Sequence, residues 1–253
     1  MTPVTRGRVF VVGALAFGAL FSWGIVELAA TVQFNELVGS YYPRVSIEEV
    51  KSFNVVSAVV FDYRGADTMI EQLILFAAVV GADLLLRKQR SEREELPRRS
   101  LPEREVPRTS AALQLAGVVL AGLSIFVAMY VILHAQFTPG GGFQSGVLLA
   151  GALLAAYIAD EYRTFTRLTS KPAIERVEAV AAGAYLVVGA IGLAVGGFFL
   201  DNFLPVGELG TLLSSGTIYL LNLIVGVEVT AGFLLIIDGF LEQTLAIRER
   251  AMP

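Results

Sequence analysis

Six runs of apolar residues dominate the pattern of hydrophobic and polar positions along this chain, and polar or charged segments separate them. The runs cover about 8–31, 66–86, 111–134, 143–160, 177–200 and 216–238. Most of them supply the ~20 apolar residues that a helix needs to cross the hydrocarbon core of a bilayer. A helix satisfies its own backbone hydrogen bonds, as a segment in lipid must. The pattern therefore predicts an all-α integral membrane protein with six transmembrane helices.

Basic residues gather in alternate connections between these runs. The N-terminal tail, segments 87–110 and 160–176, and the C-terminal tail together hold 16 of the 19 Lys and Arg residues. The other loops hold only Arg44, Lys51 and Arg64. Because Lys and Arg are enriched in cytoplasmic loops, both termini are predicted to be cytoplasmic. That orientation requires an even number of spans, and six is even.

Composition agrees with a membrane protein and excludes several kinds of chemistry. Of the 253 residues, 55% are hydrophobic and 17% are charged, and the mean hydropathy is +0.67, which leaves too few charges to cover a soluble domain. The chain has no Cys and one His, which excludes disulfides, thiolate metal sites, cysteine nucleophiles and a histidine-rich metal site. We therefore expect no catalytic residue, no metal site and no cofactor held by this chain.

Residues 87–110 form the one obvious linker, because they are charged, contain proline and include no aromatic residue. The linker separates a two-span part of the chain from a four-span part. Before the second run, residues 53–61 (FNVVSAVVF) are too few to cross a membrane. They fit a short helix that lies against the bundle on the outer side, or a re-entrant segment.

Ionisable residues inside apolar runs are functional candidates, because a charged side chain in hydrocarbon is costly. Glu228 lies near the middle of the sixth run and must face protein, water or a partner. A neutral glutamate hydrogen-bonded to a neighbouring helix and a direct role in transport are both compatible with this position. Glu71 lies about one turn inside the outer boundary of the second run and four residues after Asp67, so these two carboxylates share a helix face.

Asp62, Arg64 and Asp67 stand where the chain enters the second run. Arg64 precedes Asp67 by about one turn and can pair with it, and a carboxylate such as Asp67 also suits the positive N-terminus of a helix. A structural polar cluster and an ion-entry site are both compatible with these three residues. Asp83, near the inner end of the same run, is expected to be solvated.

The segment 134–146 (HAQFTPGGGFQSG) joins the third and fourth runs without any Lys, Arg, Asp or Glu. The fourth run is short, so its helix begins near the glycines or the turn lies below the membrane surface. An uncharged turn suits such depth if protein satisfies its backbone, and we expect hydrogen bonds from Gln144, Thr138 and His134. The Lys-Ser/Thr ending of a P-loop is absent. A tight hairpin with packing glycines and a direct ion contact are the two interpretations.

Two motifs in the four-span part resemble the B subunit of Mrp-type multisubunit Na+/H+ antiporters. They are FTPGGGFQSGVLLA at 137–150 and SSGTIYLLNLIVGVEVTAGFLLI at 214–236, and the resemblance covers about 111–240. It implies a signature turn with a structural role, formed by Pro139, Gly140, Gly141, Gly142, Phe143 and Gln144.

The stretch NVVSAVVFDYRGADTMIEQLILFAA at 54–78 is similar to the small module that ends the large A subunit of these antiporters. It is similar also to a small membrane subunit of energy-converting hydrogenases, MbhE. By this resemblance Glu71 matches the family's membrane glutamate, a candidate in the coupling-ion route, while Ile70 stands where the family pattern has glycine. The expected domains are an MbhE-like two-span module at 1–88, a charged cytoplasmic linker at 89–110 and a four-span MnhB-like domain at 111–253.

The resemblance implies a small, non-catalytic subunit of a complex that exchanges Na+ for H+ across the cytoplasmic membrane, contributing to assembly and to the cation/proton pathway. The transported ions are then Na+ and H+. The expected partners are large A- and D-type subunits, small C-, E-, F- and G-type subunits and the lipid bilayer, and not nucleic acid. The candidate ion-pathway residues are Glu71, Glu228, Asp67, Asp62, Arg64 and His134.

Two other functions fit the same chain. One is a membrane-arm subunit of a related, hydrogenase-like redox complex that couples electron transfer to Na+ or H+ translocation, and the other is a purely structural adaptor. The chain does not separate the antiporter from the redox complex, because without Cys it holds no iron–sulfur cluster in either. Co-purifying subunits that bind such clusters would favour the redox complex.

Overall fold

The computed structural model describes residues 3–31, 36–86, 110–168 and 170–250, and the regular structure in these ranges is helical. The long helices are α1 (Pro3–Thr31), α4 (Gly65–Leu86), α6 (Ala111–Leu133), α7 (Gly142–Leu168), α8 (Lys171–Val195) and α9 (Thr217–Arg250). The shorter helices are α2 (Glu36–Glu49), α3 (Val55–Ala58) and a π-helical turn, η1 (Val59–Tyr63). The predicted all-α fold class is confirmed.

Five of the described helices are long and apolar enough to cross a membrane: α4, α6, α7, α8 and α9. In α1 the apolar stretch Val11–Glu27 is shorter than these five. Many large apolar side chains on α1 and α6, such as Leu15, Trp23, Leu115 and Phe126, are exposed in the isolated chain, which suits contact with lipid or other subunits. The chain is thus a multi-pass membrane protein. The cytoplasmic location of both termini stays a prediction.

The chain forms two compact units, residues 1–44 and 45–253. The first holds α1 and the beginning of α2, where the guanidinium of Arg44 donates to the carbonyl oxygen of Ser40 at 3.0 Å. The second holds the remaining helices. The predicted linker 89–110 lies outside the described residues except for Ser110, so the division of the chain at that linker stays a prediction.

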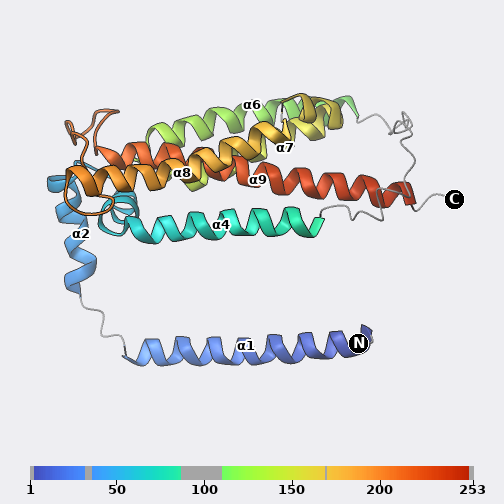
Figure 1. The fold of residues 1–253 in the computed structure, drawn as a ribbon, viewed down its shortest axis with the longest axis horizontal. Helices are drawn as coiled ribbons and strands as arrows, with labels where there is room; N and C mark the ends of the chain where they lie inside the picture. Colours follow the sequence, from blue (N-terminus) through green and yellow to red (C-terminus); the bar gives the residue numbers. More distant parts are fainter. Residues whose placement is uncertain (1–2, 32–35, 87–109, 169, 251–253) are drawn as a thin grey trace. The chain divides into compact units, whose positions relative to one another are not determined.

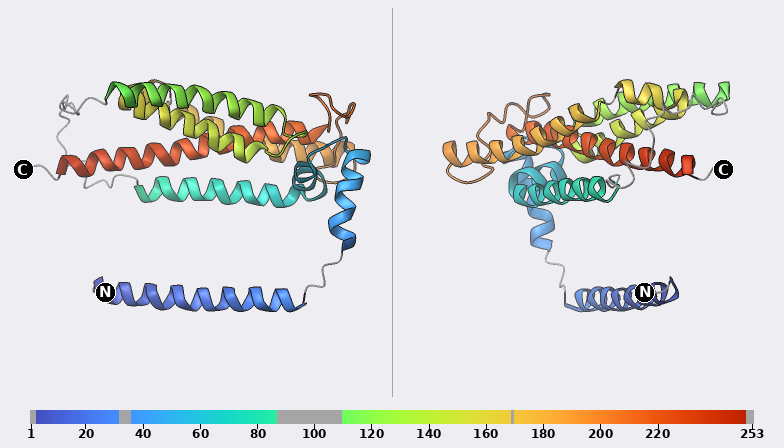
Figure 2. Two further views of the ribbon diagram at one scale, coloured as in Figure 1. Left: turned by 180° about the vertical axis from the view of Figure 1, so that it is seen from behind. Right: turned by 45° about the vertical axis from the view of Figure 1, so that its right-hand side comes forward.

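In the second unit α9 is the central helix and packs against α7, α8 and α4, while α6 packs along α7 (Figure 1). The two views of Figure 2 show these five helices side by side. In the most apolar stretch of α9, 56% of residues are buried, compared with 11% in α4, so α9 is the most buried of the five candidate spans. The core includes Ile218, Leu221, Val225 and Val229 of α9 with Tyr185 of α8.

Connections at one end of this unit carry most of its polar contacts. We call this the turn end, formed by residues 52–65, 134–141 and 196–216. Residues 53–61 contain a short helix, α3, and η1 extends it, while the choice between an outer-side helix and a re-entrant segment stays open. The side chain of Asn54 accepts hydrogen bonds from the backbone N–H groups of Val56 and Ser57, which is the standard way to cap a helix start.

The starts of two helices matter for the site, and one of them differs from the expected span. Helix α7 begins at Gly142, within the glycine run, as the shortness of the fourth apolar run predicts. Helix α8 begins at Lys171, six residues before the expected start of the span at 177. Ser170 precedes it and Pro172 occupies its first turn, a favourable place for proline. Glu178 therefore lies two turns inside α8 and not at its edge.

Candidate functional site

The turn between α6 and α7 is held by Asn54, a residue more than 80 positions earlier in the chain. Its side-chain amide donates to the carbonyl oxygens of Ala135 at 2.7 Å, Thr138 at 2.9 Å and Gly140 at 3.2 Å. Its own backbone N–H donates to the carbonyl oxygen of Gln136 at 3.0 Å. A buried carbonyl without a partner is costly, so Asn54 explains how an uncharged turn is stable here.

Neighbouring hydroxyl and amide groups extend this network at the turn end. The Ser57 hydroxyl donates to the carbonyl oxygen of Ala135 at 2.8 Å, and the Ser52 hydroxyl donates to that of Gln136 at 3.1 Å. The Gln136 side-chain amide donates to the carbonyl oxygen of Leu212 at 2.7 Å. Three segments far apart in the sequence are thereby joined, one of them from the part of the chain that precedes the linker.

The glycines of the turn permit a close approach between α7 and α9. A Cβ atom at Gly142 would lie 2.5 Å from the carbonyl oxygen of Asn222, and one at Gly146 would lie 2.7 Å from Cβ of Val229. The Asn222 side chain accepts a hydrogen bond from the N–H of Gly142 at 3.0 Å. Gly140 has φ of +141°, a conformation that residues with a side chain rarely adopt. These contacts are those of a packed hairpin.

The side chains expected to satisfy this turn are not the main donors. Gln144 is exposed, and the Thr138 hydroxyl donates to the nearby carbonyl oxygen of His134 at 3.3 Å. His134 ends α6, where its Nδ1 lies 3.0 Å from the carbonyl oxygen of Tyr130 and its ring stacks on the Tyr130 ring. The expectation holds for Thr138, but most donors come from residues 52–57, a neighbour that spacing along the chain does not reveal.

Pro139 and Phe143 complete the signature turn. Pro139 is exposed, whereas Phe143 is half-buried and packs against the core around α9. Gly141 is buried, and a Cβ atom there would lie 2.9 Å from the side-chain oxygen of Asn222. The turn thus carries no charged side chain, and most of its polar groups are those that hold it in place.

At the start of α4, the structure separates the three expected polar residues. Arg64 and Asp67 form an ion pair with 2.5 Å between Nη2 and Oδ2, and both side chains are more than half exposed. Asp62 is half-buried and lies near Asn202, Asp201 and Glu49 instead. Burial raises the pKa of Asp62 above its ordinary value, Asp201 and Glu49 raise it further, and a hydrogen bond with Asn202 opposes them.

Glu71 lies on the exposed face of α4 in the isolated chain, as does Asp67 one turn earlier. The next residue, Gln72, points the other way and is 3% exposed. A carboxylate on the outer face of a membrane span is costly in lipid. Glu71 is therefore positioned to meet a neighbouring subunit or water.

Glu228 is fully buried in α9, and neither carboxyl oxygen has a hydrogen-bond partner among the described residues. The structure thus lacks the hydrogen bond to a neighbouring helix that a purely structural glutamate would be expected to make. Tyr185 of α8 interacts electrostatically with Glu228 and with Glu71. The Tyr185 hydroxyl itself donates to the carbonyl oxygen of Gly65 at 2.9 Å and so joins α8 to the start of α4.

Sequence reasoning missed Glu178, which is 4% exposed and interacts electrostatically with Glu228. The expected span began at 177, which placed Glu178 at a solvated edge. A signal was available: Lys171, Glu175, Glu178 and Tyr185 recur at intervals of four, three and seven residues, the spacing of one helix face. Extending the helix back to Pro172, a residue favoured in a first turn, would have placed Glu178 inside it.

Asp83, expected to be solvated, is partly exposed and is also paired. Its Oδ1 lies 2.7 Å from Nζ of Lys171 at the start of α8, and both side chains are partly exposed. The pair ties the far end of α4 to α8. A partly exposed ion pair stabilises by roughly 1 kcal/mol or less.

Residues 112–235 match the model of a family described as a domain related to the MnhB subunit of Na+/H+ antiporter. The chain is also similar to a chain in the structure of the membrane-bound sulfane sulfur reductase, an archaeal respiratory membrane complex. Identity there is 30%, the TM-score is 0.67, and the similarity covers 94% of this chain and 98% of that one.

A second solved structure, the Mrp complex from Dietzia sp. DQ12-45-1b, contains a chain that is 25% identical with a TM-score of 0.65. That similarity covers 94% of this chain, which spans only 26% of the length of the Mrp chain. An uncharacterized protein of Methanocaldococcus jannaschii is 27% identical over 243 residues, which is 90% of this chain and 88% of that protein.

Proposed function

We propose the function of this protein on the premise that the chain belongs to the family of MnhB-like subunits of Mrp-type Na+/H+ antiporters. On that premise it is a small membrane subunit of a multisubunit antiporter and assembles with other Mrp-type subunits. The observation that carries this proposal is the MnhB-related domain at 112–235, whose signature turn is built as a packed hairpin on α9.

The geometry of the turn end supports a role in assembly. Asn54, Ser52 and Ser57 precede α4, and their hydrogen bonds reach the turn between α6 and α7. The segment before α4 and the MnhB-related domain are therefore joined by buried polar contacts at this end. A subunit built in this way can hold α4, with Glu71 on its exposed face, in a fixed place beside its partners.

The chain contributes to ion movement through its membrane carboxylates and has no chemistry of its own. Na+ and H+ are the transported ions, and no resident cofactor is required. The candidates for the ion route are Glu228, buried in α9, and Glu71, exposed on α4. Asp62, Arg64 and Asp67 lie near the start of α4, at the end of the bundle where such a route would open.

The test is Na+-dependent proton movement in inside-out vesicles from a host that lacks its own Na+/H+ antiporters. The chain is produced with its neighbouring subunits, and the response to added Na+ is followed with a pH-sensitive dye. The matched control is the same set of subunits without this chain. Antiport that is unchanged without the chain would contradict the proposal.

The second candidate, a membrane-arm subunit of a redox-driven complex, is favoured by one specific observation. The chain covers 98% of its relative in the sulfane sulfur reductase but only 26% of its relative in the Mrp complex. Purification of the intact complex separates the candidates. Cysteine-rich subunits with iron–sulfur clusters would favour the redox complex, and large antiporter-like subunits without them would favour the antiporter.

A further inference from the structure

Three buried side chains around α4, α8 and α9 carry polar atoms that have no hydrogen-bond partner among the described residues. They are both carboxyl oxygens of Glu228, Oε1 of Glu178 and the amide nitrogen of Gln72. The three residues are 0%, 4% and 3% exposed, so water at the surface does not reach them. Buried polar groups in native proteins are almost always satisfied, so acidic groups that gather in one place without partners need an explanation.

Contacts around Gly232 show that these groups lie close together. A Cβ atom at Gly232 of α9 would lie 3.3 Å from Oε1 of Glu178 on α8 and 3.7 Å from Cγ of Leu75 on α4. Glu228 is one turn before Gly232 on α9, and Gln72 is about one turn before Leu75 on α4. Because α4 and α9 run in the same direction from the turn end, counting back about one turn from the contact between Leu75 and Gly232 brings Gln72 and Glu228 to about the same level of the bundle.

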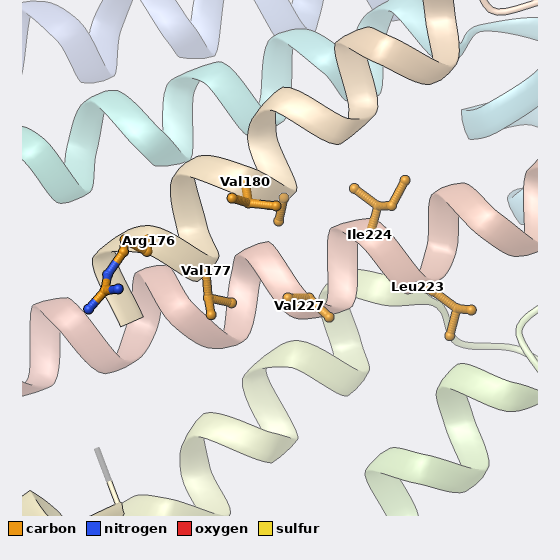
Figure 3. A pocket seen from close by; sticks show the side chains of 7 residues that line it. Arg176, Val177, Val180, Leu223, Ile224 and Val227 are labelled. Atoms are coloured by element: carbon orange, nitrogen blue, oxygen red, sulfur yellow. The ribbon is translucent and has the colours of Figure 1, made fainter. Parts of the chain in front are cut away.

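The alignment of α8 with α9 gives an independent view of the same juxtaposition. Val177 and Val227, the sequence neighbours of the two glutamates, line one apolar groove between these helices (Figure 3). Residues that precede Glu178 and Glu228 by one position thus lie level with each other. The two glutamates occupy the adjoining face of this interface, inside the bundle.

Electrostatic interactions connect the two glutamates and extend from them in both directions. Glu228 interacts with Glu178, and Glu178 interacts with Glu175, which is exposed near the start of α8. In the direction of the turn end, Tyr185 interacts with Glu228 and with Glu71. A row of ionisable groups therefore follows the α8 interface from one end of the helix into the bundle.

The two basic side chains of α8 are engaged elsewhere. Lys171 pairs with Asp83, and the guanidinium of Arg176 donates to the carbonyl oxygen of Pro172 at 2.8 Å. At the turn end Arg64 pairs with Asp67. No basic group on α4 or on the described side chains of α8 thus neutralises Glu178 and Glu228, and two neighbouring buried carboxylates cannot both remain ionised at acceptable cost.

We propose that Glu178 and Glu228 form a buried proton-binding pair between α8 and α9. One proton is held between an oxygen of each carboxyl group, and the amide nitrogen of Gln72, which has no partner among the described residues, is available as a donor at the same level. Uptake of a second proton makes the pair neutral, and its release restores one negative charge. This proposal deepens the proposed function, on which its role in transport rests, by naming the proton as the ion that this chain carries.

The test uses the assembled complex in vesicles and the variants Glu178→Gln, Glu228→Gln and the double variant. If the two carboxyl groups act as one unit, each single variant should lower Na+-dependent proton movement about tenfold or more, and the double variant should be no worse than the singles. Glu208→Gln, an exposed change in the loop before α9, is the matched control and should keep full activity. Subunit content is measured on the same vesicles.

Infrared spectroscopy of the purified complex supplies a direct readout of protonation of the pair, beside the transport assay that separates it from a structural role. At neutral pH the wild type should show a protonated-carboxyl band that shifts in D2O, and the double variant should lack it. If a glutamine variant fails to assemble, Glu228→Asp takes its place and should keep the band with reduced transport. Full transport in either glutamine variant, or no difference in the band between wild type and double variant, would overturn the proposal.

The same measurements keep this proposal apart from the proposed function. A wild-type complex that shows the band but no Na+-dependent proton movement would contradict the antiporter and leave the proton-binding pair intact. If the wild-type complex and the double-variant complex exchange ions equally well, the result would support the antiporter and overturn the proton-binding pair.

Discussion

The side-chain amide nitrogen of Asn54 lies 2.7 Å from the carbonyl oxygen of Ala135, 81 residues further along the chain. This hydrogen bond joins the segment before α4 to the turn between α6 and α7. Asn54 has two separate tasks, because its oxygen caps α3 while its nitrogen satisfies the turn. A substitution that removes the nitrogen donor but keeps the oxygen can therefore show how much the turn depends on Asn54.

Asn54→Asp should destabilise the complex, because an aspartate keeps the oxygen that caps α3 but loses the donors to Ala135 and Thr138. Leaving buried carbonyl groups without donors costs roughly 1–3 kcal/mol each. The measurement is thermal unfolding of the purified complex, with subunit content after mild detergent extraction. Asn54→Asp with wild-type stability would show that the turn does not rely on Asn54.

Gly142→Ala should weaken the contact between α7 and α9, because the new Cβ would lie 2.5 Å from the carbonyl oxygen of Asn222. Overpacking of this kind typically costs about 1–3 kcal/mol. Gly151→Ala in the same helix is the matched control, since a Cβ there has no atom within 4 Å. The control should be neutral or slightly stabilising because alanine favours helix. Equal melting temperatures for both variants would count against the close-approach role of Gly142.

Glu71→Gln should leave assembly intact, because glutamine keeps the shape of the side chain. It should reduce Na+-dependent proton movement, because glutamine cannot bind and release a proton. Glu71 is exposed on α4, so its removal disturbs no packed contact in this chain. The measurement is ΔpH-driven antiport in vesicles, with Glu208→Gln as control. Full activity of Glu71→Gln would remove Glu71 from the ion route.

Asp62→Asn should stabilise the complex at neutral pH and lose this advantage on acidification. The pKa of Asp62 is raised in the folded chain, so its ionisation costs folding free energy. The ordinary pKa of an aspartate is 3.8, and that of Asp62 is higher in the folded chain. The wild type therefore loses stability as the pH rises from 3.8 through the raised pKa, whereas the asparagine variant does not. Melting temperatures of both proteins at neutral pH and near pH 4 give the comparison. A difference independent of pH would contradict burial of the charge.

Reporter tags test the predicted orientation. A tag after Glu95, in the basic segment, and a tag at the C-terminus should both be cytoplasmic, because 16 of the 19 basic residues lie on that side. A tag near Pro139 should lie on the opposite side or be protected. An external tag after Glu95 would contradict the assignment of the spans.

The sequence alone determined the helical class, the places of most of the spans and the family resemblance. Length and hydropathy are local properties, so α6 at Ala111–Leu133 and α4 at Gly65–Leu86 match the expected runs within about one residue. The glycine run likewise predicted a helix start, because a short apolar run needs its helix to begin there, and α7 begins at Gly142.

Only the tertiary structure decided which side chains meet. The satisfaction of the turn by Asn54 and the pairing of Asp83 with Lys171 join residues more than 80 positions apart. The electrostatic interaction of Glu178 with Glu228 depends on how α8 and α9 are rotated against each other. The close approach of α7 to α9 at Gly142 and Gly146 is likewise a contact between residues far apart in the chain. The pattern of apolar residues along the chain predicts which face of each helix is buried. It does not predict how two helices are rotated against each other or which of their turns lie side by side.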